Sequence, residues 1–154
     1  MAFDKTKERT AARLAAVQAL YQMDIAATDL RDVLAEFEAR FMREGVGEKF
    51  PRTESDFFRD IVEGVVREQR MLDPLVDEAL NANWPLKRIE TILRSVMRAG
   101  AYELKHRSDI PARVVVSEYV NVASAFLDRE ETGMVNAVLD HLARHARAAE
   151  FSAR

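Results

Sequence analysis

The sequence predicts an all-α protein, a compact bundle of about seven helices. Apolar residues recur at intervals of three and four through nearly the whole chain, which is the spacing of a buried helix face. The three valines at 114–116 have strand propensity, but they are too short and isolated a run to form a sheet. Five glycines and four prolines interrupt the helical pattern, and no repeat period is visible.

Two helices are predicted in the first third of the chain. The first spans 6–26, with Asp4 or Thr6 as its N-terminal cap. The second spans 30–43, where apolar residues keep the helical spacing. The segment 44–54 follows with two glycines and a proline, so it is predicted to be a loop.

A third helix is predicted from Thr53, which opens a sequence close to a capping box. Pro74 is expected to end this helix or to open a short one over 74–82, because proline lacks the backbone N–H that a helix interior needs. The tripeptide Asn-Trp-Pro at 83–85 marks the next break. Its tryptophan, Trp84, is expected to pack where helices meet.

The second half of the chain is predicted to hold the central helix. The helix after Pro85 runs to about residue 106, and its apolar face is the widest in the chain. Gly100 lies on that face, which indicates close approach of a neighbouring helix. The segment 108–111 ends this helix. Two more helices follow. The apolar residues of the first, which extend to Leu127, and those of the second, within 135–142, are expected to pack in the core.

Composition limits the class of protein. A chain of 154 residues with 48% hydrophobic and 32% charged residues is expected to form one domain, 1–154, with short flexible termini. Cysteine is absent, which excludes disulfides, thiolate nucleophiles and cysteine metal sites. No apolar run approaches the ~20 residues of a membrane span, and no secretory signal is visible. We therefore expect a cytoplasmic protein.

Charge is unevenly distributed along the chain. The net charge is −3, but residues 24–80 hold fifteen acidic and eight basic side chains. Residues 81–110, by contrast, hold six basic and three acidic side chains. This pattern favours one local basic surface and a separate acidic surface over a protein that is basic throughout, although charges on a solvated surface also produce such segregation.

The first helix combines a basic ridge with an apolar stripe. Lys5, Arg9 and Arg13 are spaced by four residues, so they follow one slowly turning side of a helix. Leu14 begins the apolar stripe, and Tyr21 continues it and is expected in the core, although its ring could also stack on a base. Such a helix suits contact with a polyanion, and the alternative is an ordinary solvated face.

No arrangement of residues predicts catalysis or a metal. His141 and His145 are one turn apart, a spacing that can bind a metal, but no third ligand is apparent. Glu54, Asp56 and Asp60 are close in sequence without an adjacent base or nucleophile. A glycine-rich phosphate loop is also missing. We expect a protein that is not an enzyme and that needs no cofactor.

Four segments carry a family resemblance. RTAARLAAVQALYQ at 9–22, YELKHRSDIP at 102–111, SEYVNVASAF at 117–126 and MVNAVLD at 134–140 resemble the NusB family of bacterial transcription antitermination factors, in order and spacing. The resemblance implies two helical subdomains. It also implies that the protein binds boxA, a single-stranded RNA element of ribosomal-operon transcripts, together with the ribosomal protein NusE, and joins the RNA polymerase antitermination complex.

The resemblance also implies site residues. The family's arginine-rich first helix contacts RNA, and its basic positions match Arg9 and Arg13, while one family arginine falls on Thr10. Phe126 matches a phenylalanine of the family's RNA surface, and core packing is its alternative. Gln18 offers a donor and an acceptor for base edges. The candidate RNA-binding residues are Lys5, Arg9, Arg13, Gln18 and Phe126.

The acidic stretch 24–80 is expected to receive the basic partner NusE, with Asp77 and Glu78 as candidate contacts. Two other functions remain open. One is a helical scaffold that binds only protein, which the threonine at position 10 favours. The other is the RNA-targeting domain of a ribosomal RNA methyltransferase, for which a chain of this length leaves no catalytic domain.

Overall fold

The computed structural model describes residues 5–43, 52–80 and 89–152, without the side chains of 5–7, 40–43, 52 and 53. Within these residues the chain forms seven helices and no strand, so the all-α prediction is confirmed. The helices are α1 (Lys5–Ala26), α2 (Leu30–Arg43), α4 (Arg52–Ala79), α5 (Thr91–His106), α6 (Ala112–Ser124), α7 (Arg129–Ala146) and α8 (Ala148–Phe151).

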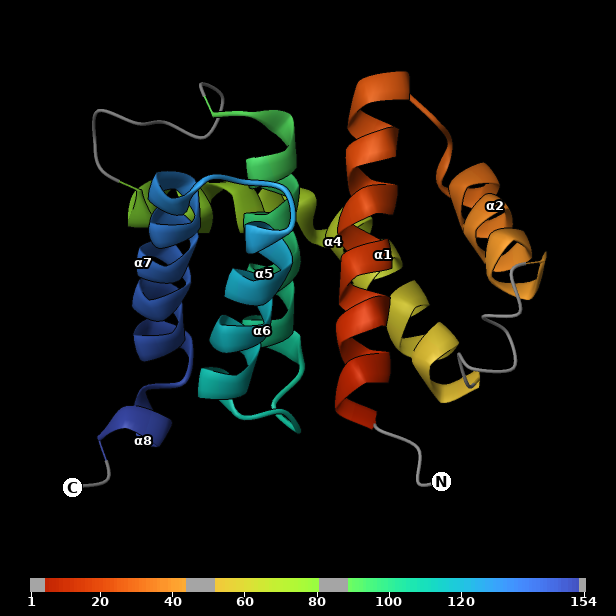
Figure 1. The fold of residues 1–154 in the computed structure, drawn as a ribbon. Helices are drawn as coiled ribbons and strands as arrows, with labels where there is room; N and C mark the ends of the chain where they lie inside the picture. The colour runs from red at the N-terminus through yellow and green to blue at the C-terminus, as the bar shows by residue number, and fades with distance from the viewer. Residues whose placement is uncertain (1–4, 44–51, 81–88, 153–154) are drawn as a thin grey trace.

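The helices form two groups that share the long helix α4. Figure 1 shows α1 and α2 on one side of the molecule, and α5, α6 and α7 on the other. Every residue of α5 from Ser95 to Leu104 is buried, so α5 is the central helix, as its wide apolar face predicts. The valines at 114–116 lie inside α6, where Val115 and Val116 are buried in this shared core and Val114 is 44% exposed.

The predicted break at Pro74 is wrong. Helix α4 continues through Pro74 to Ala79. A proline in a helix interior leaves one backbone carbonyl without its N–H donor, and this costs most where water is absent. Pro74 is exposed, so water can reach the carbonyl that it leaves unpaired. The predicted cap at Thr53 lies one residue inside α4, and the expectations for 44–51 and for Trp84 fall outside the described residues.

Two glycines mark where helices approach most closely. A Cβ atom added at Gly100 would lie 2.7 Å from a terminal methyl carbon of Leu139, so the close approach predicted for Gly100 is confirmed, with α7 as the neighbour. Gly64 of α4 faces the ring of Tyr102, and a Cβ atom there would lie 2.2 Å from the ring. Tyr102 is buried and donates a hydrogen bond to Asp60 at 2.6 Å, which holds its ring in place.

Replacing Gly64 with alanine is therefore expected to destabilise the fold. An added methyl group must displace either α4 or the Tyr102 ring, and overpacking of this kind costs roughly 1–3 kcal/mol. Urea unfolding followed by circular dichroism measures the change. Gly133→Ala is the matched control, because an added Cβ at Gly133 meets nothing within 4 Å. The control should stabilise α7 by roughly 0.5–1 kcal/mol, and equal effects of the two changes would contradict the prediction.

None of the helices in the described parts of the chain has the length and apolar character that crossing a membrane requires.

Candidate nucleic-acid interface

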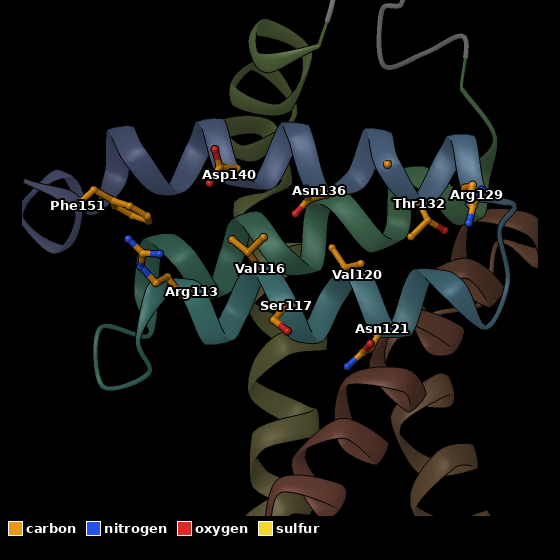
Figure 2. Close-up of a pocket in the computed structure, with 11 residues that line it drawn as sticks. Arg113, Val116, Ser117, Val120, Asn121, Arg129, Thr132, Asn136, Asp140 and Phe151 are labelled. Carbon is orange, nitrogen blue, oxygen red and sulfur yellow. The ribbon is translucent and has the colours of Figure 1, made fainter.

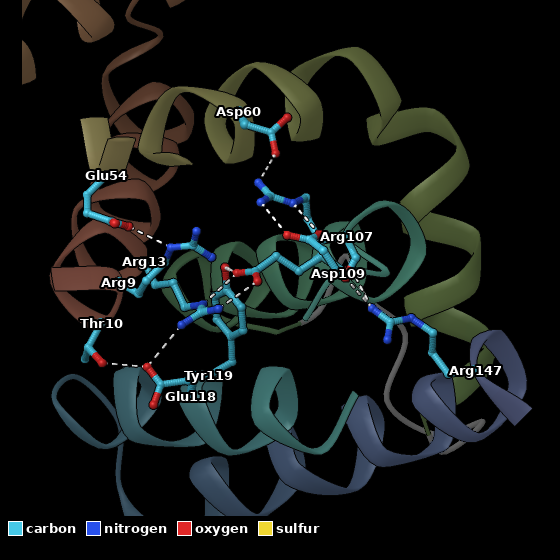
Figure 3. Close-up of polar contacts among 11 residues, drawn as sticks. Arg9, Thr10, Arg13, Glu54, Asp60, Arg107, Asp109, Glu118, Tyr119 and Arg147 are labelled. Atoms are coloured by element: carbon cyan, nitrogen blue, oxygen red, sulfur yellow. Dashed lines mark hydrogen bonds and ion pairs between the residues drawn. The ribbon is translucent and has the colours of Figure 1, made fainter. Parts of the chain in front are cut away.

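Arg13 lies inside the protein rather than on an exposed ridge. Its side chain is only 2% exposed and donates to both carboxylate oxygens of Glu103, at 2.8 and 3.0 Å. A third bond reaches Glu118 at 3.1 Å. Because Glu103 belongs to α5 and Glu118 to α6, Arg13 joins three helices, as Figure 3 shows.

The buried ion pair is completed by Tyr119. The Tyr119 hydroxyl donates to Glu103 at 2.5 Å, and burial raises the pKa of this phenol well above its usual value. Burial opposes the charge of Arg13, but the hydrogen bond and negative charge of Glu103 outweigh burial, so the pKa of Arg13 is raised. The guanidinium therefore stays charged while it is bonded internally.

The exposed position predicted for Arg13 on a basic ridge is wrong, because Arg13 is buried. Each step of four residues advances a helix by about 400°, so the ridge turns by roughly 80° between Lys5 and Arg13. That rotation carries Arg13 from the solvent side into the contact with α5 and α6. The same contact uses Thr10, where the family arginine is missing: its hydroxyl donates to Glu118 at 2.5 Å.

Arg9 keeps part of its side chain open to solvent. It is 33% exposed and donates to Glu54 at 2.7 Å, a carboxylate at the start of α4 that is almost fully buried. Its guanidinium also lies over the ring of Phe57, 4.3 Å from the ring centroid. Arg9 is therefore paired and oriented, and about a third of its side chain remains exposed to solvent.

Arg107 joins the same cluster, although the sequence did not predict it there. Its guanidinium lies 4.9 Å from the Phe57 ring centroid and donates to Asp109 at 3.0 and 2.9 Å and to Asp60 at 3.1 Å. The hydrogen bonds from Arg107 lower the pKa of Asp109 to about 2. The only sequence signal was an arginine two residues before an aspartate in the segment between two predicted helices.

The bonded partner Asp60 has a second role. It accepts the hydrogen bond from Tyr102, and burial together with that bond raises the pKa of Tyr102 to about 12. Thus Glu54 and Asp60, which have no evident partner in the sequence, neutralise Arg9 of α1 and Arg107 just after α5. The described part of the chain holds no group of three side chains that could bind a metal.

The remaining candidate RNA residues lie apart from this cluster. Gln18 is exposed on α1, and Phe126 is 39% exposed in the turn after α6. Tyr21, one turn beyond Gln18, is 38% exposed, so the expectation of a core position for Tyr21 is wrong. Lys5 is in the first turn of α1, and the structure describes its backbone only.

The two candidate partner residues lie at the end of α4. Asp77 and Glu78 are both exposed there. His141 and His145 pack edge to face on α7, with ring centroids 4.4 Å apart, and both are exposed. This ring contact gives the pair a packing role on the surface of α7.

Comparison with known proteins shows which family the sequence belongs to. The family model described as the NusB family matches residues 10–144. The chain belongs to the NusB family. Transcription antitermination protein NusB of Bradyrhizobium diazoefficiens is 64% identical over 148 residues, which cover 96% of this chain and 90% of that protein. The corresponding protein of Nitrobacter hamburgensis is 62% identical over 149 residues, with 96% and 93% covered.

Solved NusB structures have the same fold. T. maritima NusB matches with a TM-score of 0.77 and 28% identity, over 93% of this chain and 96% of that chain. A structure of the antitermination factors NusB and NusE in complex with double-stranded RNA matches with a TM-score of 0.75 and 21% identity, over 90% and 98% of the two chains. The latter likeness concerns the fold alone.

Proposed function

We propose that this chain is a transcription antitermination factor that binds boxA-type single-stranded RNA of ribosomal-operon transcripts together with NusE. In that role it joins the RNA polymerase antitermination complex and catalyses no reaction. The observation that carries the proposal is identity above 60%, over nearly the whole chain, to proteins named transcription antitermination protein NusB. A structure of NusB and NusE in complex with double-stranded RNA has the same fold, and the proposal extends that likeness to single-stranded boxA RNA.

The exposed face of α1 is suited to unpaired RNA. Proteins recognise single strands by stacking bases on aromatic rings, bonding base edges and holding phosphates with cations. Tyr21 presents an aromatic ring and Gln18 an amide on the exposed side of α1, while Arg9, about half a turn round the helix from Gln18, presents a partly exposed guanidinium at another edge. Phe126 adds a second exposed ring in the turn after α6. These four residues are the direct RNA contacts that we propose, together with Lys5, four residues before Arg9.

The acidic surface of α4 supports a basic protein partner. Asp77 and Glu78 are exposed at the end of this helix. They belong to the stretch 24–80, which holds fifteen acidic and eight basic side chains. Complementary charge steers association and fixes orientation more than it adds affinity. We therefore propose the end of α4 as the surface that receives NusE.

A protein-binding scaffold without RNA affinity is the second candidate. Arg9 and Arg13 both form salt bridges to carboxylates of the same chain, so α1 presents less free positive charge than its sequence indicates. The experiment that separates the two functions is binding of a boxA oligonucleotide and of a scrambled oligonucleotide, with and without NusE. Preferential binding of boxA supports the antitermination factor. Binding of NusE without any RNA binding supports the scaffold.

Arg9 is expected to contact a phosphate. Replacing Arg9 alone would leave the buried Glu54 carboxylate without this cation, so the test uses Arg9→Gln combined with Glu54→Gln. Loss of one phosphate contact should make the dependence of log K on log salt shallower by about 0.7 for a single strand. Salt titrations of boxA binding, with Arg31→Gln on α2 as the control, measure this. An unchanged slope would place the phosphate contact elsewhere.

A further inference from the structure

A groove runs between α6 and α7 on the surface of the second helical group. Its volume is about 550 Å³. Figure 2 shows Arg113 and Phe151 at one end of the groove and Arg129 and Thr132 at the other, with Val116, Val120 and Asn136 between them. From Arg113 to Asn121, the groove follows about 12 Å of α6, because a helix rises 1.5 Å per residue.

The two arginines of the groove differ from most others in the protein. Arg113 and Arg129 are exposed, and neither pairs with a carboxylate of the described residues. Asp140, the acidic residue of the groove, is already bound by Arg144 at 2.9 Å. Elsewhere in the described parts of the chain, eight arginines form salt bridges: Arg9, Arg13, Arg59, Arg67, Arg98, Arg107, Arg144 and Arg147. The groove therefore carries free positive charge, whereas Arg9 and Arg13 of α1 are neutralised by carboxylates.

The end of the groove at Arg113 is held in place by the C-terminal helix. Glu150 accepts hydrogen bonds from the backbone N–H of Ala112 at 2.8 Å and from Arg147 at 2.6 Å, which fixes α8 against the start of α6. The backbone bond from Ala112 and the bond from Arg147 lower the pKa of Glu150, so the carboxylate stays charged. The Arg113 guanidinium lies over the ring of Phe151, 5.1 Å from its centroid. This contact positions the cation over the groove.

The walls between the two cations are mostly uncharged. Thr132 and Asn136 of α7 lie opposite Val116 and Val120 of α6, while Ser117 and Asn121 lie at the outer rim, on the side of α6 away from α7, and these hydroxyl and amide groups both donate and accept. Gly133 has no side chain, so the backbone of α7 is open there. Cations at the ends, amides along the walls and valines between them suit a nucleotide strand, which has phosphates, base edges and apolar base faces.

One edge of the groove lies next to the contact between α6 and α1. Ser117 precedes Glu118, and Glu118 accepts hydrogen bonds from Thr10 and Arg13 of α1. An RNA strand that crosses α1 thus meets α6 at this contact and reaches the groove on its other side. The cations of the groove then lie along the continuation of the strand beyond α1.

We propose that the α6–α7 groove binds the phosphate backbone of the single-stranded RNA, with Arg113 and Arg129 as its cations. The site extends the RNA path beyond α1 and rests on the proposed function. In this proposal, the free cations that hold the RNA phosphates lie mainly in the groove and not among the arginines of α1.

The test compares two double variants of the full-length protein, Arg113→Ala with Arg129→Ala and Arg31→Ala with Arg70→Ala. Both remove two exposed arginines, so net charge changes equally, but Arg31 and Arg70 lie on α2 and α4. Binding of a fluorescent boxA-type oligonucleotide is measured over a range of salt concentrations, with and without NusE. Loss of two phosphate contacts should flatten the salt slope by about 1.4 and weaken binding about 25-fold at roughly 0.1 M salt. The control should change neither by a comparable amount.

A second pair of variants adds charge inside the groove without removing a contact. Gly133→Glu and Gly133→Gln place side chains of equal size where an added Cβ meets nothing within 4 Å. The glutamate should weaken RNA binding about fivefold relative to the glutamine, the effect of one unit charge about 4 Å from a phosphate in water. Equal stability of the two variants in urea shows that the difference is electrostatic.

The outcomes separate this proposal from the proposed function. If the unmodified protein binds RNA and the groove variants match the control, the groove proposal is overturned and the antitermination role stands. If the groove variants lose affinity for NusE but not for RNA, the groove is a protein-binding site, which also overturns the proposal. If the unmodified protein binds no RNA with or without NusE, both proposals fail.

Discussion

Replacing Arg13 with methionine will lower the free energy of unfolding by about 3–5 kcal/mol, the usual cost of breaking a buried ion pair from one side. Glu103 is fully buried and takes two of its bonds from Arg13. Without the guanidinium, the carboxylate would remain in the core with the Tyr119 hydroxyl as its remaining donor. Urea unfolding at neutral pH measures the loss.

Matched variants separate the ion pair from simple loss of packing. Combining Arg13→Met with Glu103→Gln removes the buried charge as well, so it should recover about 1 kcal/mol or more of the loss. Arg59→Met is the control, because Arg59 pairs with Glu38 and Glu63 on the surface, where salt bridges contribute less than about 1 kcal/mol. If Arg13→Met costs no more than Arg59→Met, the ion pair contributes little.

The Arg13 variants also test the RNA surface. Because Arg13 is only 2% exposed, it is not accessible to a phosphate, and its loss should leave the salt slope of RNA binding unchanged. Any fall in RNA affinity then arises through displacement of α1 from α5 and α6. A flatter salt slope in folded Arg13→Met protein would mean that Arg13 leaves Glu103 and binds RNA directly.

NusE is expected to tighten the binding of boxA RNA by roughly 10²–10⁴-fold, the usual gain when two binding surfaces hold one ligand. Alone, the protein offers the RNA few free cations on α1, since Arg9 and Arg13 are paired, and its net charge is −3. A basic partner docked on the acidic side of α4 would add positive surface and further contacts to the same strand.

Titration of RNA into the protein and into the protein–NusE complex measures this factor directly. Thermodynamic linkage requires RNA to strengthen the binding of NusE by the same factor, so calorimetry of NusE binding with and without RNA is an internal check. Asp77→Asn with Glu78→Gln should weaken NusE binding without changing RNA binding by the protein alone. Equal RNA affinities in the two titrations would show that the two ligands bind independently.

Features that depend on neighbours in the sequence were predicted well. The second helix has its predicted bounds, 30–43, and the first begins within a residue of its predicted start. These elements follow from apolar residues three and four apart, and that spacing acts within one or two turns of helix. The role of Gly100 was also predictable, because a glycine on a wide apolar face usually marks a close contact between helices. The family resemblance, carried by four local segments, was confirmed for the same reason.

The site was less predictable, because its contacts join residues that are distant in the sequence. Arg13 and Glu103 are 90 positions apart, and Arg9 and Glu54 are 45 apart. A helical pattern indicates which side of α1 carries arginines, but their burial depends on whether another helix brings a carboxylate to them. The exposure of Tyr21 and the tolerance of Pro74 were likewise decided by which neighbouring helices cover each position.

The amino-acid sequence by itself thus determined the all-α class, the bounds of the first two helices and membership of the NusB family, since each rests on local spacing or on local segments. The tertiary structure alone decided which arginines remain free. It buried Arg13 against Glu103 and left Arg113 and Arg129 along a groove between α6 and α7. The physical reason is that a charged side chain binds whichever opposite charge lies within a few ångströms, and only the packing of the helices sets those distances.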